Sequence, residues 1–167
     1  MMLPMPIASN TSPILNLSII GKLDLLQKQF DEVKIPPAVL DELKLDSKFP
    51  GGDQIQQAID QGWLEVVQFR NNEVAQVLAR ELDLGEAEAI ALALENDSHM
   101  ILMDEHEGRQ IAKSLGLSPI GVLGVFLHEK KDNNSFSVTQ EMDNLRQQAG
   151  FFIAEKLYHR VIDLAGE

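Results

Sequence analysis

Short apolar runs alternate along this chain with longer stretches that have the period of an amphipathic helix. The apolar runs predict strands at residues 4–9, 33–35, 63–67 and 100–103, and a last short strand at residues 119–120. Strands that alternate with helices predict parallel βαβ units, in which helices cover both faces of a central sheet. The pattern therefore favours an α/β fold with right-handed crossovers between the strands.

Helix start and stop signals fit the segments between these strands. Thr11 or Ser12 can cap a helix that has Pro13 in its first turn and Gly21 after its end. Further helices are predicted at residues 23–30, 37–44, 54–61, 72–82, 86–96, 106–115, 122–131, 139–148 and 155–164. The helix that Glu86 opens is apolar nearly all round, which predicts that it is buried on most sides.

Length and composition narrow the class of protein. The 167 residues contain no internal repeat and no linker, so we expect one domain over residues 1–167, with C-terminal helices from about residue 139. No run approaches the about 20 apolar residues that span a bilayer, and the first residues lack the basic region of a secretory signal. The absence of cysteine excludes disulfides and thiolate metal sites, and a cytoplasmic location is expected. The net charge of −12 argues against strong non-specific binding to nucleic acid and suits a basic partner.

Polar residues follow two of the predicted strands. Asn10 comes after the first strand, and Asp104 comes after the fourth. In an open parallel sheet, ligands bind outside the carboxyl ends of the strands. If the first and fourth strands are neighbours, Asn10 and Asp104 lie close together at that edge.

Two further carboxylates fit the same edge. Glu86 lies in the first turn of the most apolar helix, where the helix dipole favours a carboxylate, although Glu88 is an alternative. Glu42 flanks the buried stripe of its own helix, whereas Asp41 points away from that stripe.

Carboxylates that converge in a cleft repel one another unless a cation neutralises them. Oxygen ligands without cysteine suit a hard cation such as Mg²⁺ or Mn²⁺, which can clamp a phosphodiester and activate water. Each residue also has a simpler interpretation. Asp104 and Glu107 can form a helix-capping pair, Asn10 an Asx turn and Glu86 a helix cap, while Glu42 can be a solvated surface carboxylate.

The sequence gives less support to a zinc site, a nucleotide-binding loop or a hydrolase nucleophile. The four histidines are scattered and form no zinc motif, and neither a Walker A sequence nor a nucleophile elbow is present. Arg109 lies one turn into the helix after Asp104, so it can meet a phosphate near the site or pair with a surface acid.

Taken together, these segments resemble the PIN-domain superfamily, and in particular its VapC-like branch of nucleic-acid-binding proteins. The resemblance runs in order through residues 9–13 (SNTSP), 35–42 (IPPAVLDE), 84–91 (LGEAEAIA), 102–109 (LMDEHEGR) and 120–125 (IGVLGV), and includes the tail from 149 to 167. It implies a PIN-like three-layer α/β/α fold, whose central parallel sheet of about five strands has the order 3-2-1-4-5. It also implies a Mg²⁺- or Mn²⁺-dependent endonuclease for single-stranded RNA, expected as a homodimer and blocked in many members by an antitoxin protein.

Under this resemblance, Glu42, Glu86 and Asp104 occupy the second, third and fourth acid positions. Thr11 and Ser12 match the hydroxyls beside the first, where they are expected to contact nucleic acid. Nuclease members carry Asp at the first position, where this chain has Asn10. An amide oxygen can still bind a cation, but it adds no charge and cannot act as a base. The sequence therefore leaves two functions open: a metal-dependent ribonuclease, or a nuclease-inactive PIN module that binds RNA or a protein partner.

Overall fold

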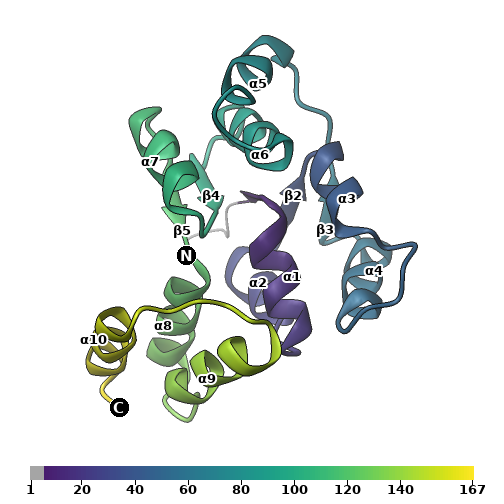
Figure 1. The fold of residues 1–167 in the computed structure, drawn as a ribbon. Coiled ribbons are helices and arrows are strands. Elements are labelled where there is room, and N and C mark those ends of the chain that lie inside the picture. The colour runs from purple at the N-terminus through teal and green to yellow at the C-terminus, as the bar shows by residue number, and fades with distance from the viewer. Residues whose placement is uncertain (1–5) are drawn as a thin grey trace.

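Five short strands form one parallel sheet in the computed structural model, which describes residues 6–167 (Figure 1). They are β1 (Ile7–Ser9), β2 (Val33–Ile35), β3 (Leu64–Val66), β4 (Met100–Leu102) and β5 (Ser118–Ile120). Their order is β3-β2-β1-β4-β5, which confirms the predicted sheet order. Residues 4 and 5 of the first predicted strand lie outside the described residues.

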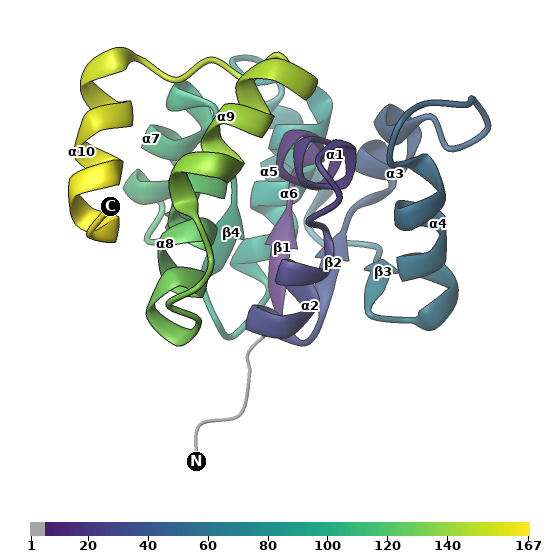
Figure 2. The ribbon, with the colours of Figure 1, turned by 90° about the horizontal axis from the view of Figure 1, so that it is seen from below.

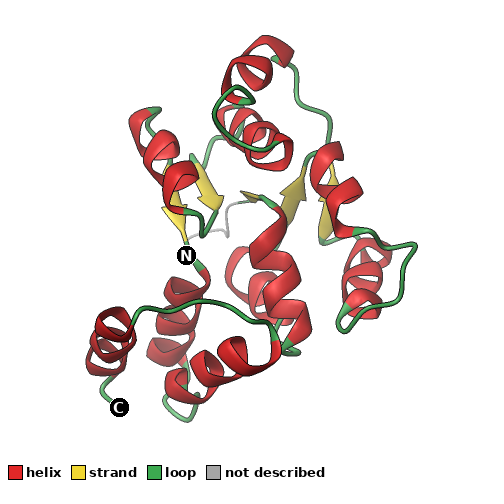
Figure 3. Cartoon of the chain, viewed as in Figure 1, coloured by secondary structure: helices red, strands yellow, loops and turns green. Residues whose placement is uncertain are grey.

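Ten helices connect and follow the strands within residues 6–167 (Figure 3). They are α1 (Thr11–Ile19), α2 (Asp24–Phe30), α3 (Pro37–Leu43), α4 (Gly52–Gln61), α5 (Asn72–Leu78), α6 (Leu84–Leu94), α7 (His106–Ser114), α8 (Val122–Asp132), α9 (Val138–Gln148) and α10 (Glu155–Ala165).

Two predicted helix starts were wrong. The N-cap residue of α1 is Asn10, not Thr11 or Ser12, and its extended backbone (φ −85°, ψ −169°) ends the strand and opens the helix. Helix α6 begins at Leu84 rather than Glu86, because the side chain of Asp83 accepts a hydrogen bond from the backbone N–H of Glu86 at 2.8 Å. The segment 83–85 is therefore a helix start.

The strands alternate their side chains between two apolar layers, as the period of two requires. Ile7 and Leu102 face the layer that contains α1, α2, α8 and α9. Their neighbours Ala8 and Ile101 face the layer that contains α6 and α7. Figure 2 shows these two helical layers on opposite sides of the sheet. Helix α6 is buried along most of its length against β1 and β4, as its apolar sequence predicted.

The connection between α9 and α10 is held at both of its ends. The backbone N–H of Phe151 donates to the carbonyl oxygen of Leu145 at 3.0 Å. Arg146 donates to the carbonyl oxygen of Ile153 at 2.7 Å, and its guanidinium lies 4.1 Å from the centre of the Tyr158 ring. This segment, residues 149–154, passes beside the edge of the sheet where the polar residues gather. Within residues 6–167, no helix is both long and apolar enough to cross a membrane.

Glu167 ties α10 to the start of α9, and its removal should destabilise the protein. Its carboxylate accepts hydrogen bonds from the backbone N–H groups of Val138 and Thr139 at 2.7 and 3.0 Å, and it lies 3.5 Å from the amine of Lys130. Burial acts to raise the pKa of Glu167, but these hydrogen bonds outweigh it and lower the pKa to about 2. We expect Glu167→Gln to cost about 1 kcal/mol at pH 7, the usual contribution of a helix cap.

The sign of this effect with pH follows from the lowered pKa. The carboxylate contributes its stability above its ordinary pKa of 4.5, and that contribution disappears as the pH falls toward about 2. Urea denaturation at pH 7 and pH 2.5 measures it, with Asp163→Asn on the exposed side of α10 as the control. If Glu167→Gln loses the same free energy of unfolding at pH 2.5 as at pH 7, the capping role of the carboxylate is contradicted.

Candidate acidic site

The ends of β1 and β4 bring two distant segments together. The backbone N–H of Asn10 donates to the carbonyl oxygen of Leu102 at 3.3 Å, which extends the pairing of the two strands by one residue. The Asn10 side chain is buried, with 3% of the residue exposed. The expected position of Asn10, at the carboxyl edge beside the end of the fourth strand, is therefore found in the structure.

Glu105 is the acid that contacts Asn10 directly. The amide nitrogen of Asn10 donates to one Glu105 oxygen at 2.8 Å, and the hydroxyl of Ser12 donates to the other, also at 2.8 Å. The amide oxygen of Asn10 is buried and has no hydrogen-bond partner among the described residues. One buried oxygen is thus left unpaired at the centre of this edge, which is uncommon in folded proteins.

Glu42 reaches the same edge from α3. One of its carboxylate oxygens accepts a hydrogen bond from the hydroxyl of Thr11 at 3.0 Å. The carboxylate lies against Gly85 so closely that a Cβ at that position would overlap it. Burial raises the pKa of Glu42, the Thr11 hydrogen bond lowers it, and the negative charge of Asp83 raises it further. Glu42 and the neighbouring Asp41 are both exposed residues, but within the described part of the chain Asp41 forms no side-chain hydrogen bond.

Glu86 lies at the start of α6, with 8% of the residue exposed. One of its oxygens would be 3.0 Å from a Cβ at Gly108, so the carboxylate sits against the first turns of α7. Burial is the largest cause that raises its pKa to about 8, followed by Asp83 and then by the charges of Glu105 and Glu42. This is the strongly perturbed acid at the edge, and it interacts with the cap residue of its own helix and with acids from two other segments.

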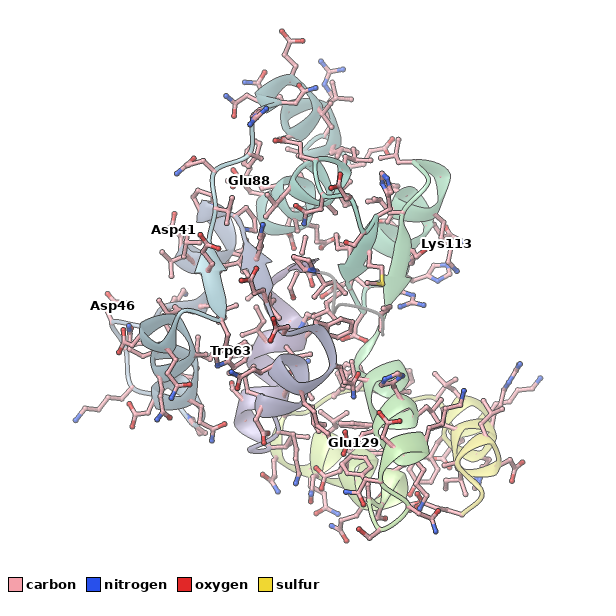
Figure 4. All side chains as sticks on the ribbon, turned by 180° about the vertical axis from the view of Figure 1, so that it is seen from behind. Asp41, Asp46, Trp63, Glu88, Lys113 and Glu129 are labelled. Carbon is pink, nitrogen blue, oxygen red and sulfur yellow. The ribbon has the colours of Figure 1, made fainter. Side chains whose placement is uncertain are left out.

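Glu88 has a different environment from Glu86. It lies on the side of α6 that faces α3 and accepts a hydrogen bond from the backbone N–H of Ala38 at 3.1 Å (Figure 4). Its carboxylate therefore satisfies the first turn of α3. Of the two candidate acids on α6, Glu86 is influenced by the charges of both Glu105 and Glu42, whereas the charge of Glu88 acts on Glu42.

Asp104, the fourth expected site residue, is adjacent to Glu105 in the chain and is affected by its charge. One of its oxygens accepts a hydrogen bond from the backbone N–H of Val122 at 3.0 Å, and the other is buried without a partner in the described residues. Burial raises its pKa to about 6, and the Val122 hydrogen bond and the charge of Arg109 act against this. The residue that opens α7 is Glu105, and no side chain caps that helix. Asp104 thus stabilises the start of α8 and not the start of its own following helix.

Arg109 contacts the end of β4. Its guanidinium donates to the carbonyl oxygen of Met103 at 2.9 Å and lies close enough to Asp104 to lower the pKa of that acid. It also lines a groove between α8 and α10.

The four acids form a row along the edge of the sheet rather than a closed ring. Glu42 and Glu105 both raise the pKa of Glu86, and Glu105 also raises that of Asp104, so the row runs Glu42, Glu86, Glu105, Asp104. Within residues 6–167, no three acids or histidines lie together closely enough to hold a metal ion. The donor chemistry nevertheless fits a hard cation, because every donor is an oxygen and the buried oxygens of Asn10 and Asp104 lack partners.

Two acids at this edge were not singled out from the sequence. They are Glu105, which belongs to the row, and Asp83, which caps α6 beside it. The available signal for Glu105 was Asn10 itself, since a buried amide needs an acceptor and Glu105 follows the neighbouring strand. For Asp83, the signal was its position three residues before Glu86, the usual spacing of a helix cap.

Comparison with known proteins agrees with the fold. A family model described as PIN domain matches residues 6–167. No curated protein and no solved structure matches the chain. The matched region contains the whole parallel sheet and every residue of the acidic row. The chain therefore belongs to the PIN-domain family, which has a nuclease-type fold.

Proposed function

We propose that this chain is a metal-dependent endonuclease that cleaves single-stranded RNA. The observation that carries the proposal is the row of acids at the carboxyl edge of the sheet, where burial and like charge raise the pKa of Glu86 to about 8 and that of Asp104 to about 6. Acids held in this way gain most from a divalent cation, which neutralises their mutual repulsion. PIN domains generally use divalent metal ions and bind nucleic acids, which supports the same reading.

The proposed ligands are oxygen atoms of Asn10, Glu42, Glu86 and Asp104, with Glu105 placed between the last two. When bound, Mg²⁺ or Mn²⁺ would supply an activated water and a clamp for the phosphodiester. Thr11 and Ser12 act by holding the carboxylates of Glu42 and Glu105 through their hydroxyl groups. Arg109 supplies a positively charged side chain beside Asp104, where its guanidinium can contact a phosphate of the substrate.

Cleavage of a single-stranded RNA by the purified protein, with Mn²⁺ and with EDTA, tests the proposal. We expect cleavage that depends on Mn²⁺, that is lost in Asp104→Ala, and that is retained in Asp41→Ala, the exposed acid beside Glu42. Absence of cleavage by the unaltered protein, or cleavage undiminished by Asp104→Ala, would overturn the assignment.

A nuclease-inactive module that binds RNA or a protein partner is the second candidate. Two observations favour it: the Asn10 amide already satisfies Glu105, and the described residues contain no ready cluster of three acids. Calorimetry separates the candidates. If Mg²⁺ and Mn²⁺ do not bind at millimolar concentrations, while Asn10→Asp restores binding and cleavage, the second candidate is correct.

The toxin role and the homodimer are part of the proposal and come from the family resemblance alone. Expression of this chain by itself should arrest growth, and a small protein encoded next to it should relieve the arrest. Light scattering of the purified chain should give twice the monomer mass. Normal growth with the chain expressed alone would remove the toxin role without affecting the RNA-cleavage proposal.

A further inference from the structure

Phe152 is the most exposed large apolar residue of the described chain, with 86% of its surface open to solvent. It lies in the segment 149–154, between α9 and α10. Hydrogen bonds hold the residues on either side. The backbone N–H of Phe151 donates to the carbonyl oxygen of Leu145, and the carbonyl oxygen of the buried Ile153 accepts from the guanidinium of Arg146. The ring is therefore presented to solvent by an anchored backbone, which is an unfavourable position for an aromatic side chain that has no partner.

Two hollows meet at Phe152. The first, of about 330 Å³, is lined by Ser12, Asp104 and Glu105 together with residues 149–152, so it opens onto the acidic row. The second, of about 570 Å³, lies between α8 and α10 and includes Arg160. Asp104, Phe151 and Phe152 line both hollows, so the exposed ring of Phe152 stands where the acidic site continues into the groove.

Arg160 gives the groove a positive charge in a protein with a net charge of −12. It is exposed on α10, and no carboxylate within residues 6–167 forms an ion pair with it. The first turn of α10 places Leu157 on the same groove, so aromatic, apolar and cationic groups line it together. Single-stranded nucleic acid offers groups that suit such a lining, because its bases stack on aromatic rings and its phosphates pair with arginine.

We propose that Phe152 is a stacking platform for one base of a single-stranded nucleic acid beside the acidic row, and that Arg160 contacts a neighbouring phosphate. The proposal rests on the proposed function, because it names how the substrate of that site is held. It adds a positioning role for Phe152 and Arg160, which follow the acids of the row in the chain. The alternative is that Phe152 contacts a protein partner and no nucleic-acid base. The following measurement distinguishes the two.

Binding is measured by fluorescence anisotropy of a short single-stranded RNA, with Ca²⁺ in place of Mn²⁺ so that binding is separated from cleavage. We expect Phe152→Leu to weaken binding about tenfold, in the range for one base stacked on an aromatic residue, and Phe152→Trp to bind at least as tightly as the unaltered protein. Val77→Ala, which alters an exposed apolar residue on α5, should leave binding unchanged. Arg160→Gln should reduce the slope of log affinity against log salt by about one.

An abasic position in the RNA gives a readout that a merely structural role of Phe152 would not change. A series of RNAs carries the abasic position at successive places along the strand. For the unaltered protein, one place should weaken binding, because the base that stacks on Phe152 is missing there. For Phe152→Leu, the same place should have no effect on binding.

The outcomes separate this inference from the function on which it rests. If the unaltered protein binds RNA with the expected Phe152 dependence but never cleaves it, the endonuclease is wrong and the stacking role holds. If the protein cleaves RNA and Phe152→Leu binds it as tightly as before, the stacking role is wrong and the exposed ring belongs to a protein-binding surface. Failure of the unaltered protein to bind RNA overturns the stacking role.

Discussion

Replacing Asn10 with Asp should lower the free energy of unfolding by about 3 kcal/mol in EDTA and should increase the stabilisation that Mn²⁺ provides. The amide of Asn10 now donates to Glu105 at 2.8 Å in a buried position. A carboxylate there has no proton to donate at neutral pH, so a hydrogen bond is exchanged for repulsion between two acids. A divalent cation removes that repulsion, and the added charge strengthens its binding.

Thermal and urea denaturation, with EDTA and with Mn²⁺, measure this prediction. Asn72→Asp is the matched control, since it adds the same charge at an exposed position in α5. The prediction fails if Asn10→Asp is as stable as the unaltered protein in EDTA. It also fails if Mn²⁺ stabilises the variant no more than it stabilises the unaltered protein. The first result would mean that the contact between Asn10 and Glu105 does not contribute to stability, and the second that the Asn10 position does not face the cation.

The strand pattern could be predicted from sequence because each strand is a short apolar run between polar or turn residues. Residues 33–35 were predicted as a strand and form β2 with the same bounds. The predicted helix at 72–82 was too long, since α5 ends at Leu78. Its apolar period continues to Leu82, which is buried, but the chain there leaves the helix in order to place Asp83 as the cap of α6. Local pattern detects burial and cannot distinguish one helix that continues from two helices that share a core.

The neighbourhood of Asn10 and the end of the fourth strand could be predicted because the topology of a parallel sheet fixes which strand ends meet. The identity of the acid that contacts Asn10 could not. Asp104 and Glu105 are consecutive, and their directions depend on a contact with Val122, the residue that opens a helix 18 positions later. Sequence pattern carries no record of such a hydrogen bond, so the first of the two acids was expected to lie against Asn10 and the second is found there.

Glu86→Gln should make the protein more stable at pH 8 by about 2 kcal/mol and leave it nearly unchanged at pH 5. Burial, Asp83 and the neighbouring acids raise the pKa of Glu86 from 4.5 to about 8. Between these values the unfolded chain has released the proton while the folded protein still holds it, so stability falls as the pH rises. Each pKa unit corresponds to about 1.4 kcal/mol, and we expect less than the full shift because the acids of the row share it. Glutamine stays neutral at every pH, and the variant therefore avoids this loss.

Urea denaturation in EDTA at several pH values from 5 to 8 measures the difference. Glu32→Gln is the control, because Glu32 is exposed at the opposite edge of the sheet, just before β2, and its replacement is the same chemical change at a solvated position. Parallel stability curves for Glu86→Gln and the unaltered protein would show that Glu86 is ionised without cost in the absence of a cation. The acidic row would then lack the repulsion that a divalent ion is proposed to relieve, and the case for a metal-dependent nuclease would lose its physical basis.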